Sequence, residues 1–304
     1  MKGFTVEGDE AGLTLAALAR RHRLADTWSE ARRLIERGKL FVDGRCVTDP
    51  AERPRDGAEV ELRAAARVPV PLPAGEIVFE DSQLVILDKP AGVSSVPYEA
   101  RETGTAMDLV RAHWKRAGRR ATETPLHVVH RIDKETSGLL CFAKTKTAER
   151  ALQDLFRAHD VDRSYRCIAH GRVESRRIDS FLVENRGDGL RGSARDGRGK
   201  RAITHVEAVG PVGARATECI VKLETGKTHQ IRIHLAESGH PLVGERVYIR
   251  DFVARGGEPL PSARLLLHAE TLGFVHPQSG ERLRFERPPP DDFRREMAAL
   301  RKLR

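Results

Sequence analysis

A proline-rich stretch near residue 70 most constrains how this chain can fold. It reads RAAARVPVPLPAGE (residues 63–76) and holds three prolines in five positions, without hydrophobic periodicity. Proline lacks a backbone N–H donor and favours extended structure, so this stretch is expected to be a linker. The 304 residues are enough for one large and one small domain. We therefore predict a small domain at residues 1–65, a linker at 66–75 and a large domain at 76–304.

The large domain is predicted to contain more strands than helices. Runs rich in β-branched and apolar residues, such as LVILDK, LLCFAKT, SYRCIAHG and ECIVKLET, are separated by polar turns. Two helical patterns stand out, TAERALQDLFRAHDV and a shorter one that ends at Gly239. Strands and helices do not alternate strictly. The pattern therefore predicts an α+β fold, in which helices flank a mixed, largely antiparallel central sheet.

The small domain is predicted to hold two helices followed by a β-hairpin. Apolar residues recur at helical spacing in TLAALAR and in SEARRLIE. Thr27 or Ser29 can cap the second helix, and Gly38 can end it. The run KLFVDGRCV then gives two strands around Asp43-Gly44, a dipeptide suited to a tight primed turn. The polar side of this unit carries a set of basic side chains: Arg20, Arg21, Arg23, Arg32, Arg33, Arg37 and Lys39.

The net charge of the chain favours a polyanionic partner. Lys and Arg total 53 against 44 Asp and Glu, which gives a formal net charge of +9. Nucleic acid is favoured over a membrane surface, because no basic amphipathic helix stands out. The alternative, in which the charge serves only solubility, stays open at this point.

Several other classes of protein do not fit the sequence. No run of about 18 apolar residues is present that could span a membrane. The segment MKGFTVEGDEAG lacks the basic-then-apolar pattern of a signal peptide, so we expect a cytoplasmic protein. The four cysteines stand far apart and without metal-ligand spacing, which favours buried free thiols over a zinc site or disulfides. No interface stripe is evident, and we expect a monomer.

The loop HRIDKETSG (residues 130–138) is a dense polar segment between two predicted strands. Asp133 can be a turn residue that accepts backbone hydrogen bonds, or a nucleophile or base at the mouth of a cleft. Arg131 can bind phosphate or form an ion pair, and His130 can be a general base or a hydrogen-bonded scaffold residue. Three residues are expected to be structural, two through their hydroxyls and one by giving the backbone room: Thr136, Ser137 and Gly138. Composition alone does not choose among these roles.

The small domain resembles the S4 RNA-binding module. The order of its predicted elements is similar, and the run RRLIERGKLFVDGR matches the usual signature of that module. The run TWSEAR departs from the commoner Ser-Arg pattern just before the second helix. The resemblance implies a small α/β domain in which Arg32, Arg33 and Lys39 contact RNA.

The large domain resembles the RluA-type pseudouridine synthases. HRIDKETSGLL is similar to their signature H-R-[LI]-D-x-x-T-S-G-L. Four further segments resemble family motifs in the same order: VILDKPAGV, DRSYRCIAHG, LETGKTHQIRIHLAESGHPLVGERVY and LLLHAETLGFVHPQSGE. The resemblance covers roughly residues 76–290 and implies the pseudouridine synthase fold. It also implies an isomerase that breaks the N1–C1′ bond of a uridine in structured RNA, turns the uracil and rejoins it through C5.

The resemblance assigns roles to three residues. Asp133 is the essential carboxylate, which acts on the ribose by attacking C1′ or by removing the 2′ proton. Arg232 is the fixed cation beside it, and such a charge keeps a carboxylate ionised and orients it. Tyr165 is the tyrosine that packs under the uracil and is placed to help remove the C5 proton. From the residues alone, Arg232 can also be a surface charge and Tyr165 an ordinary strand tyrosine.

A stacked uridine must be extracted from folded RNA before it can react, which costs a few kcal/mol. The resemblance implies that Arg131 fills the vacated space in the base stack. A guanidinium plane is well suited to stacking on bases. Lys227, Thr228 and Gln230 are expected to shape the pocket or to hold phosphate.

Other residues of the motifs are expected to lie outside the chemistry. His229 and His234 are expected to be structural, and Lys89 and Pro90 to help form the wall of the cleft. Glu245 follows Gly244, whereas the residue after this glycine is more commonly Asp in the family. We expect this change to bear on substrate choice more than on activity.

The reaction that the resemblance implies is an internal rearrangement without redox change or net hydrolysis. It therefore requires no cofactor and no metal, and its partner is RNA, either ribosomal or transfer RNA. Two other classes stay open: an RNA-binding or chaperone-like protein that kept the S4 module and the fold without catalysis, and a nucleoside hydrolase that acts on free nucleotides. Retention of the three reactive residues argues against the first, and the basic charge, which fits a polymer, argues against the second.

Overall fold

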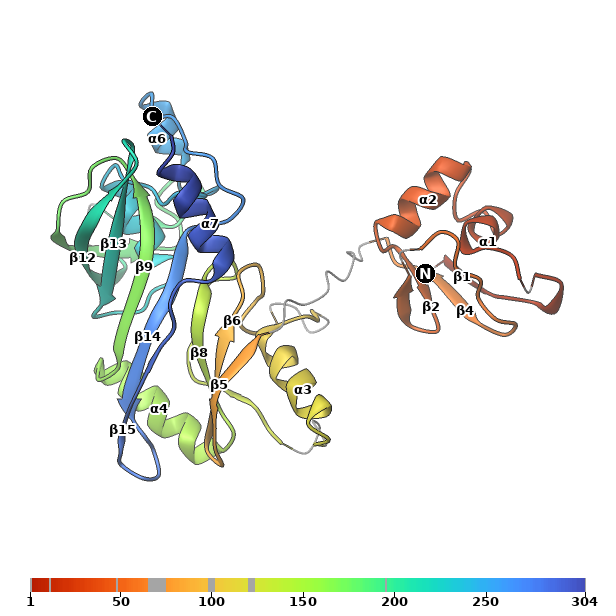
Figure 1. The fold of residues 1–304 in the computed structure, drawn as a ribbon, viewed down its shortest axis with the longest axis horizontal. Coiled ribbons are helices and arrows are strands. Elements are labelled where there is room, and N and C mark those ends of the chain that lie inside the picture. The colour runs from red at the N-terminus through yellow and green to blue at the C-terminus, as the bar shows by residue number, and fades with distance from the viewer. Residues whose placement is uncertain are drawn as a thin grey trace. The chain divides into compact units, whose positions relative to one another are not determined.

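The fold is described from a computed structural model (Figure 1). The chain forms two compact units, residues 1–72 and 73–304, and each is described by itself. The predicted linker at 66–75 lies outside the described residues except for Gly75. The structure describes residues 2–10, 12–47, 49–64, 75–97, 102–119, 124–194 and 196–303.

The first unit consists of two helices packed on a four-stranded antiparallel sheet with the strand order β1-β4-β2-β3. Leu18 and Ile35 from the two helices pack against Leu40 and Val60 of the sheet. The predicted helix, helix, hairpin order is confirmed. Its elements are β1 (Lys2–Thr5), η1 (Gly8–Glu10), α1 (Leu15–Arg21), α2 (Trp28–Glu36), β2 (Leu40–Val42), β3 (Arg45–Val47) and β4 (Glu59–Leu62).

Local capping and turn chemistry fix these elements. Thr27 is the N-cap of α2, and its hydroxyl accepts the backbone N–H of Glu30 at 3.1 Å. Gly38 follows the helix with a φ of +64°. Asp43 and Gly44 both have positive φ, +48° and +74°, as a primed hairpin turn requires.

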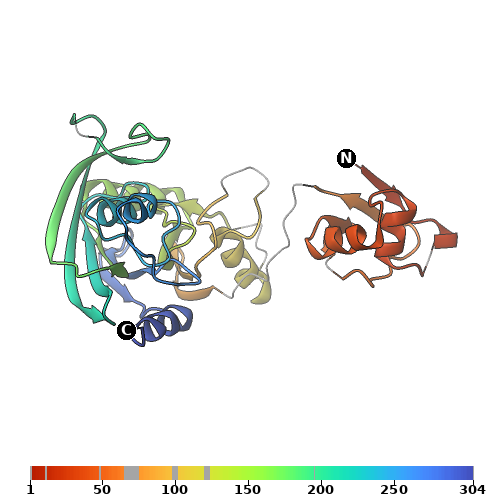
Figure 2. The same cartoon turned by 90° about the horizontal axis from the view of Figure 1, so that it is seen from above.

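The second unit is built on one large sheet with the order β11-β10-β12-β13-β9-β14-β8-β6-β5, to which β15 adds beside β14 and β7 beside β8. Of the described strand pairs, only β14 and β8 run parallel. The mixed, largely antiparallel sheet is therefore confirmed. Figure 2, the view from above, shows β10 and β12 towards one edge of this sheet.

The strands of the second unit are β5 (Glu76–Glu80), β6 (Leu84–Lys89), β7 (His127–Val128), β8 (Ser137–Ala143), β9 (Asp162–His170), β10 (Arg176–Val183), β11 (Gly192–Ser193), β12 (Lys200–Val212), β13 (Ala216–Leu223), β14 (Leu267–Val275) and β15 (Arg282–Glu286). Its helices are α3 (Ala106–Arg116), α4 (Lys146–Ala158), α5 (Gln230–Glu237), α6 (Arg250–Ala254) and α7 (Asp291–Leu300). No helix in the described ranges is long and apolar enough to cross a membrane.

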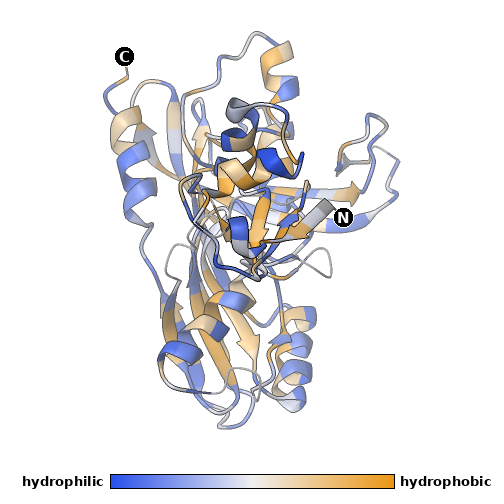
Figure 3. Cartoon of the chain, turned by 90° about the vertical axis from the view of Figure 1, so that its right-hand side faces the viewer, coloured by the Kyte–Doolittle hydropathy of each residue, from blue (hydrophilic) through white to orange (hydrophobic). Residues whose placement is uncertain are grey.

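Helices cover both faces of the sheet because its strands are apolar on both sides. Along β6, Ile86 packs with Leu152 of α4, whereas the neighbouring Leu87 packs with Trp114 of α3. On the other half of the sheet, α5 packs against Cys167 of β9, and α7 packs against the adjacent Ile168. Figure 3 shows hydrophobic residues concentrated along the strands. The helices α4 and α5 border the same cavity, which carries the candidate site.

Candidate active site

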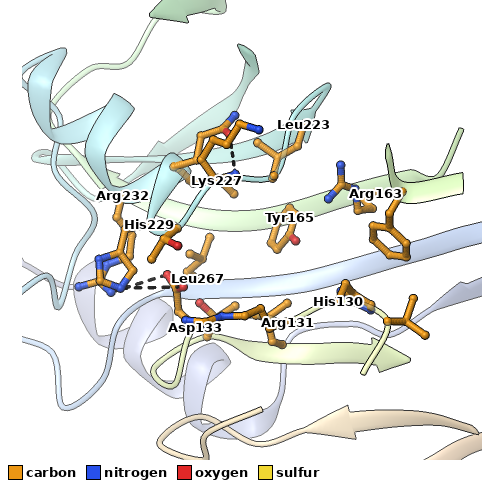
Figure 4. A pocket seen from close by; sticks show the side chains of 18 of the residues that line it. His130, Arg131, Asp133, Arg163, Tyr165, Leu223, Lys227, His229, Arg232 and Leu267 are labelled. Carbon is orange, nitrogen blue, oxygen red and sulfur yellow. Dashed lines mark hydrogen bonds and ion pairs between the residues drawn. The ribbon is translucent and has the colours of Figure 1, made fainter. Parts of the chain in front are cut away.

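A cavity of about 570 Å³ opens on the face of the sheet that α4 and α5 border. This volume lies within the range of about 300–1,000 Å³ that is typical of small-molecule sites. Residues from β9, β14 and the loops before β8 and α5 complete its wall (Figure 4). Nine residues that the sequence predicts for the site line this cavity: His130, Arg131, Asp133, Thr136, Tyr165, Lys227, Thr228, Gln230 and Arg232.

Buried groups behind the cavity hold the loop that carries Asp133. The ammonium of Lys89, which is 0% exposed, donates to the carbonyls of Pro90 (2.9 Å), Val93 (2.7 Å) and Lys134 (3.1 Å). Burial lowers the pKa of Lys89 to about 7. Neither Lys89 nor Pro90 lines the cavity, so the expectation that they form its wall is wrong. Lys89 instead ties the loop after β6 to the loop that carries Asp133.

The C-terminal end of the loop is fixed to β14. Gly138 has a φ of +112°, and a Cβ atom there would lie 2.2 Å from the carbonyl oxygen of Ala269 on the parallel strand. Only glycine allows this approach. The hydroxyl of the buried Ser137 accepts from Arg264 at 2.7 Å and contacts Nδ1 of His268 at 2.9 Å. These contacts anchor the loop that presents Asp133.

His130 is held as a scaffold residue. Its Nε2 accepts the backbone N–H of Cys141 at 3.1 Å, and its ring stacks on Phe156 with a centroid distance of 4.5 Å. Burial, and to a lesser degree the charge of Arg163, lowers the pKa of His130 to about 3. The neutral ring therefore has no free acceptor nitrogen. Of the two roles considered for His130, this geometry favours the scaffold over the general base.

The Asp133 carboxylate faces the cavity, and two side chains from the α5 region, Arg232 and His229, lie close to it (Figure 4). Its Oδ2 lies 3.7 Å from Nη1 of Arg232, and its Oδ1 lies 4.0 Å from Nε2 of His229. Both distances exceed normal hydrogen-bond length. The side chain of Asp133 is 19% exposed, so the carboxylate is within reach of a ligand in the cavity.

Arg232 is locked by Glu245 rather than by Asp133. Its Nε and Nη2 donate to the two carboxylate oxygens of Glu245, both at 2.8 Å, in a bidentate pair. Burial alone would lower the pKa of the Arg232 guanidinium, but the hydrogen bonds and charge of Glu245 raise it. Burial opposes ionisation of Glu245, yet Arg232 holds the pKa of this carboxyl below its usual value. Arg232 is 6% exposed, which excludes the surface-charge alternative.

The sequence did not indicate the part played by Glu245. We expected the change from Gly-Asp to Gly-Glu to bear on substrate choice, whereas the side chain is buried against the cation that faces Asp133. One oxygen of Glu245 also accepts the backbone N–H groups of Arg246 (3.0 Å), Val247 (2.8 Å) and Tyr248 (3.3 Å). The sequence did offer one indication: Glu245 replaces the Asp of the motif, so a carboxylate is kept at this position.

Tyr165 forms the middle of the cavity. It lies on β9 opposite Val221 of β13 and packs in a cluster with Ile132, Ile231 and Leu267. The side chain is largely buried, and burial raises the pKa of its phenol. Tyr165 therefore presents an aromatic surface and a protonated hydroxyl to this part of the cavity (Figure 4).

The far end of the cavity carries a cation that sequence reasoning missed. Arg163 lies two residues before Tyr165, so both side chains project from the same face of β9. Its guanidinium lies 5.2 Å from the ring centroid of Phe156, and its buried Nε has no hydrogen-bond partner. In the described part of the chain, no carboxylate forms an ion pair with Arg163, Arg131 or Lys227. The alternation with Tyr165 was the signal that could have found Arg163.

Gln230 is fully engaged within the protein. Its Oε1 accepts from the Thr225 hydroxyl and the Lys227 backbone N–H, at 2.8 and 3.0 Å. Its Nε2 donates to the Ile203 carbonyl and the Thr204 hydroxyl, at 3.0 and 2.9 Å. These contacts use the hydrogen-bonding capacity of the amide. We therefore no longer expect Gln230 to contact RNA; it fixes the loop before α5 to β12.

The remaining predicted residues lie elsewhere. Arg32 and Arg33 are exposed on α2, and Lys39 is half-buried just before β2, all within the first unit. Three cysteines of the second unit are buried free thiols, and Cys46 of the first unit is half-buried. Among the residues that the structure describes, no group of His, Cys, Asp or Glu is arranged to hold a metal ion.

Comparisons with known proteins show which family the chain is similar to. The family model described as RNA pseudouridylate synthase matches residues 83–237, and the S4 domain model matches residues 14–60. The ribosomal large subunit pseudouridine synthase D of Zymomonas mobilis is 37% identical and covers 82% of this chain and 81% of its own length. A protein of the same name from Neisseria meningitidis serogroup A is 34% identical over 98% of this chain and 82% of its own length.

The fold also matches a solved structure. Human RNA pseudouridylate synthase domain containing 4 superposes with a TM-score of 0.60 at 24% identity, covering 74% of this chain and 92% of that one. This likeness shows a shared fold. Together with the family match over half of the sequence, the relatives show that the chain belongs to the RNA pseudouridylate synthase family of enzymes, with an S4 domain before the catalytic unit.

Proposed function

We propose that this enzyme isomerises uridines of large-subunit ribosomal RNA to pseudouridine and that Asp133 is its essential carboxylate. The observation that carries the proposal is the position of Asp133 in the cavity, between a cation locked by Glu245 and the ring of Tyr165. The choice of ribosomal RNA rests on the names of the relatives. Transfer RNA is the alternative substrate.

The chemistry begins at the ribose. Asp133 either attacks C1′ or removes the 2′ proton, and in both routes the N1–C1′ bond breaks with its electron pair going to the uracil. The uracil then turns, and C5 forms the new bond to C1′. In the first route this bond displaces the Asp133 carboxylate from C1′, and in the second route Asp133 returns the proton to C2′. Arg232 supports this step by facing the carboxylate with a fixed positive charge at 3.7 Å. Glu245 holds that charge in place, so it does not have to reorganise during the reaction.

Tyr165 contributes the surface on which the uracil lies. A ring in the middle of the cavity can stack on the base and keep it close to the ribose after the bond has broken. The C5 proton must leave after the new bond has formed. Because burial raises the pKa of Tyr165, its phenol can accept this proton only if it passes on its own proton in the same step.

Three cations without carboxylate partners among the described residues support a polymeric substrate. Arg131, Arg163 and Lys227 line the cavity and are available to phosphate oxygens or base edges. We infer that Arg131, which is exposed on the loop beside Asp133, replaces the extracted base in the stack. Exposed basic residues of the S4 domain, among them Arg32 and Arg33, extend the contact along the RNA.

The proposal is tested with large-subunit ribosomal RNA transcripts that carry [5-³H]uridine. Wild-type enzyme is expected to release tritium and to form pseudouridine in the digested RNA. Asp133→Asn is expected to bind the transcript with unchanged affinity and to release no tritium above the level without enzyme. Product formation by Asp133→Asn at the wild-type rate would overturn the role of Asp133.

Two further substrates separate the alternatives. Release only from labelled transfer RNA transcripts would replace the ribosomal assignment. Cleavage of free uridine monophosphate, with RNA left unmodified, would show a nucleoside hydrolase instead of an RNA isomerase.

A further inference from the structure

A second side chain faces Asp133 besides Arg232. Nε2 of His229 lies 4.0 Å from Oδ1 of Asp133, whereas Arg232 approaches the other carboxylate oxygen, Oδ2. The other ring nitrogen, Nδ1, lies 2.8 Å from the hydroxyl of Tyr248. The two rings meet edge to face, with centroids 5.6 Å apart. The imidazole therefore bridges a phenol and the carboxylate.

The hydrogen-bonding pattern selects one tautomer of His229. Burial lowers the pKa of His229, so the ring is neutral and carries one proton. Burial raises the pKa of Tyr248 to about 12, so its hydroxyl keeps a proton to donate. When Tyr248 donates to Nδ1, Nε2 carries the ring proton and points it at Asp133. The other tautomer would set a nitrogen lone pair against a carboxylate oxygen, which is unfavourable.

The backbone of His229 supports the same orientation. His229 is the residue before α5 and has a φ of +58°, in the left-handed region that few residues other than glycine occupy. Its side chain makes no capping hydrogen bond to the helix. The imidazole at this N-cap position is therefore not used to start the helix and is directed to Tyr248 and Asp133.

One turn holds both groups that face the carboxylate. Glu245 begins this turn and binds Arg232 through two hydrogen bonds of 2.8 Å. Tyr248 ends it, donates its backbone N–H to Glu245 at 3.3 Å, and binds His229. The buried ring of Tyr248 also lies 5.4 Å from the guanidinium carbon of Arg232. The turn thus fixes the two side chains relative to each other.

We propose that His229 is a positioning residue for Asp133: oriented by Tyr248, its neutral ring donates Nε2–H to Oδ1 while Arg232 faces Oδ2. This inference rests on the proposed role of Asp133 and adds a second partner to it. A movement of about 1 Å brings the pair from 4.0 Å to hydrogen-bond distance. With a different partner at each oxygen, the carboxylate is fixed in rotation as well as in place, which aims it at the ribose.

The test compares four variants of the full-length enzyme on tritium-labelled ribosomal RNA transcripts. His229→Ala is expected to lower kcat roughly 10- to 100-fold and to leave KM within about twofold of wild type. His229→Gln, which can place an N–H near the position of Nε2, is expected to recover most of that loss. Tyr248→Phe is expected to lower kcat roughly fivefold, the effect of one oriented hydrogen bond. In the double variant His229→Ala/Tyr248→Phe, the tyrosine change is expected to have no further effect.

His113→Ala is the matched control, because His113 is also half-buried but lies on α3, on the face of the sheet opposite to α4, and does not line the cavity. Its kcat is expected to stay at the wild-type value. Thermal unfolding of each variant verifies that the fold is retained.

Three results would overturn the inference: wild-type kcat in His229→Ala, an equal loss in the Gln and Ala variants, or an undiminished effect of Tyr248→Phe in the absence of His229. The last result would mean that Tyr248 acts through Arg232 alone. Failure of the proposed function is recognised separately, since Asp133→Asn would then keep its activity. If Asp133→Asn is inactive while His229→Ala is fully active, only the present inference fails.

Discussion

The arginines at the two ends of the cavity differ in whether a carboxylate pairs with them. At the Asp133 end, Arg232 is buried, and Glu245 engages two of its nitrogens. At the far end, Arg163 packs over Phe156, and no carboxylate of the described residues pairs with it. A guanidinium whose donors are engaged keeps a fixed direction, whereas one with free donors can bind an incoming anion. We therefore expect Arg232 to orient the reacting carboxylate and Arg163 to bind RNA.

Loss of the ion pair between Arg232 and Glu245 is expected to have the largest effect on stability and on kcat. Glu245→Gln removes the charge that compensates Arg232 and leaves the guanidinium buried with a weaker partner. We expect a loss of about 3 kcal/mol in the free energy of unfolding. We also expect a fall in kcat of roughly 100-fold, because displacement of a positioning group by about 1 Å can cost that much. Denaturant titration and tritium release measure the two effects.

Glu245→Asp is the control, since it restores the residue that is commoner in the family. It is expected to keep kcat within about tenfold of wild type, because a carboxylate still faces Arg232. If Glu245→Gln matches wild type in both stability and kcat, the pair has no part in positioning Asp133.

The stability of the protein is expected to fall in acid because of His130, which lies near Arg163 (Figure 4). The folded protein keeps His130 neutral down to a pKa of about 3, whereas in the unfolded chain His130 takes up a proton near pH 6.5. The unfolded state therefore binds more protons between these values, and stability falls as the pH is lowered through this window. From pH 6.5 to 4 we expect His130 to account for a loss of about 3 kcal/mol.

His130→Gln offers a matched comparison, since its amide oxygen can accept the Cys141 N–H without titrating. The variant is expected to lose less stability than wild type over the same pH range in denaturant titrations. If the free energy of unfolding depends on pH in the same way in both proteins, His130 is not the cause of the loss of stability in acid.

Removing the unpaired cation is expected to weaken RNA binding rather than chemistry. Arg163→Gln is expected to raise the Kd and KM for ribosomal RNA about tenfold and to leave kcat within about twofold. The slope of log Kd against log salt concentration is expected to decrease by about 1, the effect of one lost phosphate contact.

Arg157→Gln is the control for this prediction, because Arg157 borders the same cavity but already pairs with Asp154 at 2.5 Å. We expect its Kd to change less than twofold. An equal loss of affinity in both variants would mean that ion pairing does not distinguish the two arginines.

The smallest effect is expected from the S4 domain. Arg32→Gln and Arg33→Gln change side chains on α2 that are exposed to solvent. Exposed side chains are less fixed in position than those that line the cavity. Each variant is expected to raise the Kd for RNA about two- to threefold and to leave kcat unchanged. Filter binding at several salt concentrations measures both terms, and a loss of kcat in either variant would contradict a role limited to binding.

Local features of the fold could be predicted from the sequence. Thr27 as an N-cap and the Asp43-Gly44 turn depend on neighbours within a few residues, so their structures follow from local chemistry. The helix α3 has a similar local signal, a capping box between Thr105 and Asp108, but its sequence was not recognised as a helix. Within the site, the resemblance to a family chose among the roles that the residues alone left open for Asp133.

Contacts between distant segments could not be predicted in this way. Glu245 reaches Arg232 across a turn, and the motif showed the presence of a carboxylate but not its partner. Gln230 is satisfied by groups of β12, a strand that lies well before it in the chain. Lys89 donates to backbone carbonyls of Val93 and Lys134. Every residue has a backbone carbonyl, so the residue types do not show that these two are its partners. Each of these depends on tertiary packing that only the folded structure defines.

The most direct test of the central role of Asp133 is to map pseudouridine in the large-subunit ribosomal RNA of cells that lack the gene. We expect at least one uridine to remain unmodified in these cells, to be converted again when the wild-type gene is returned, and to stay unmodified with the Asp133→Asn gene. Restoration of the modification by Asp133→Asn would contradict the essential role of this carboxylate.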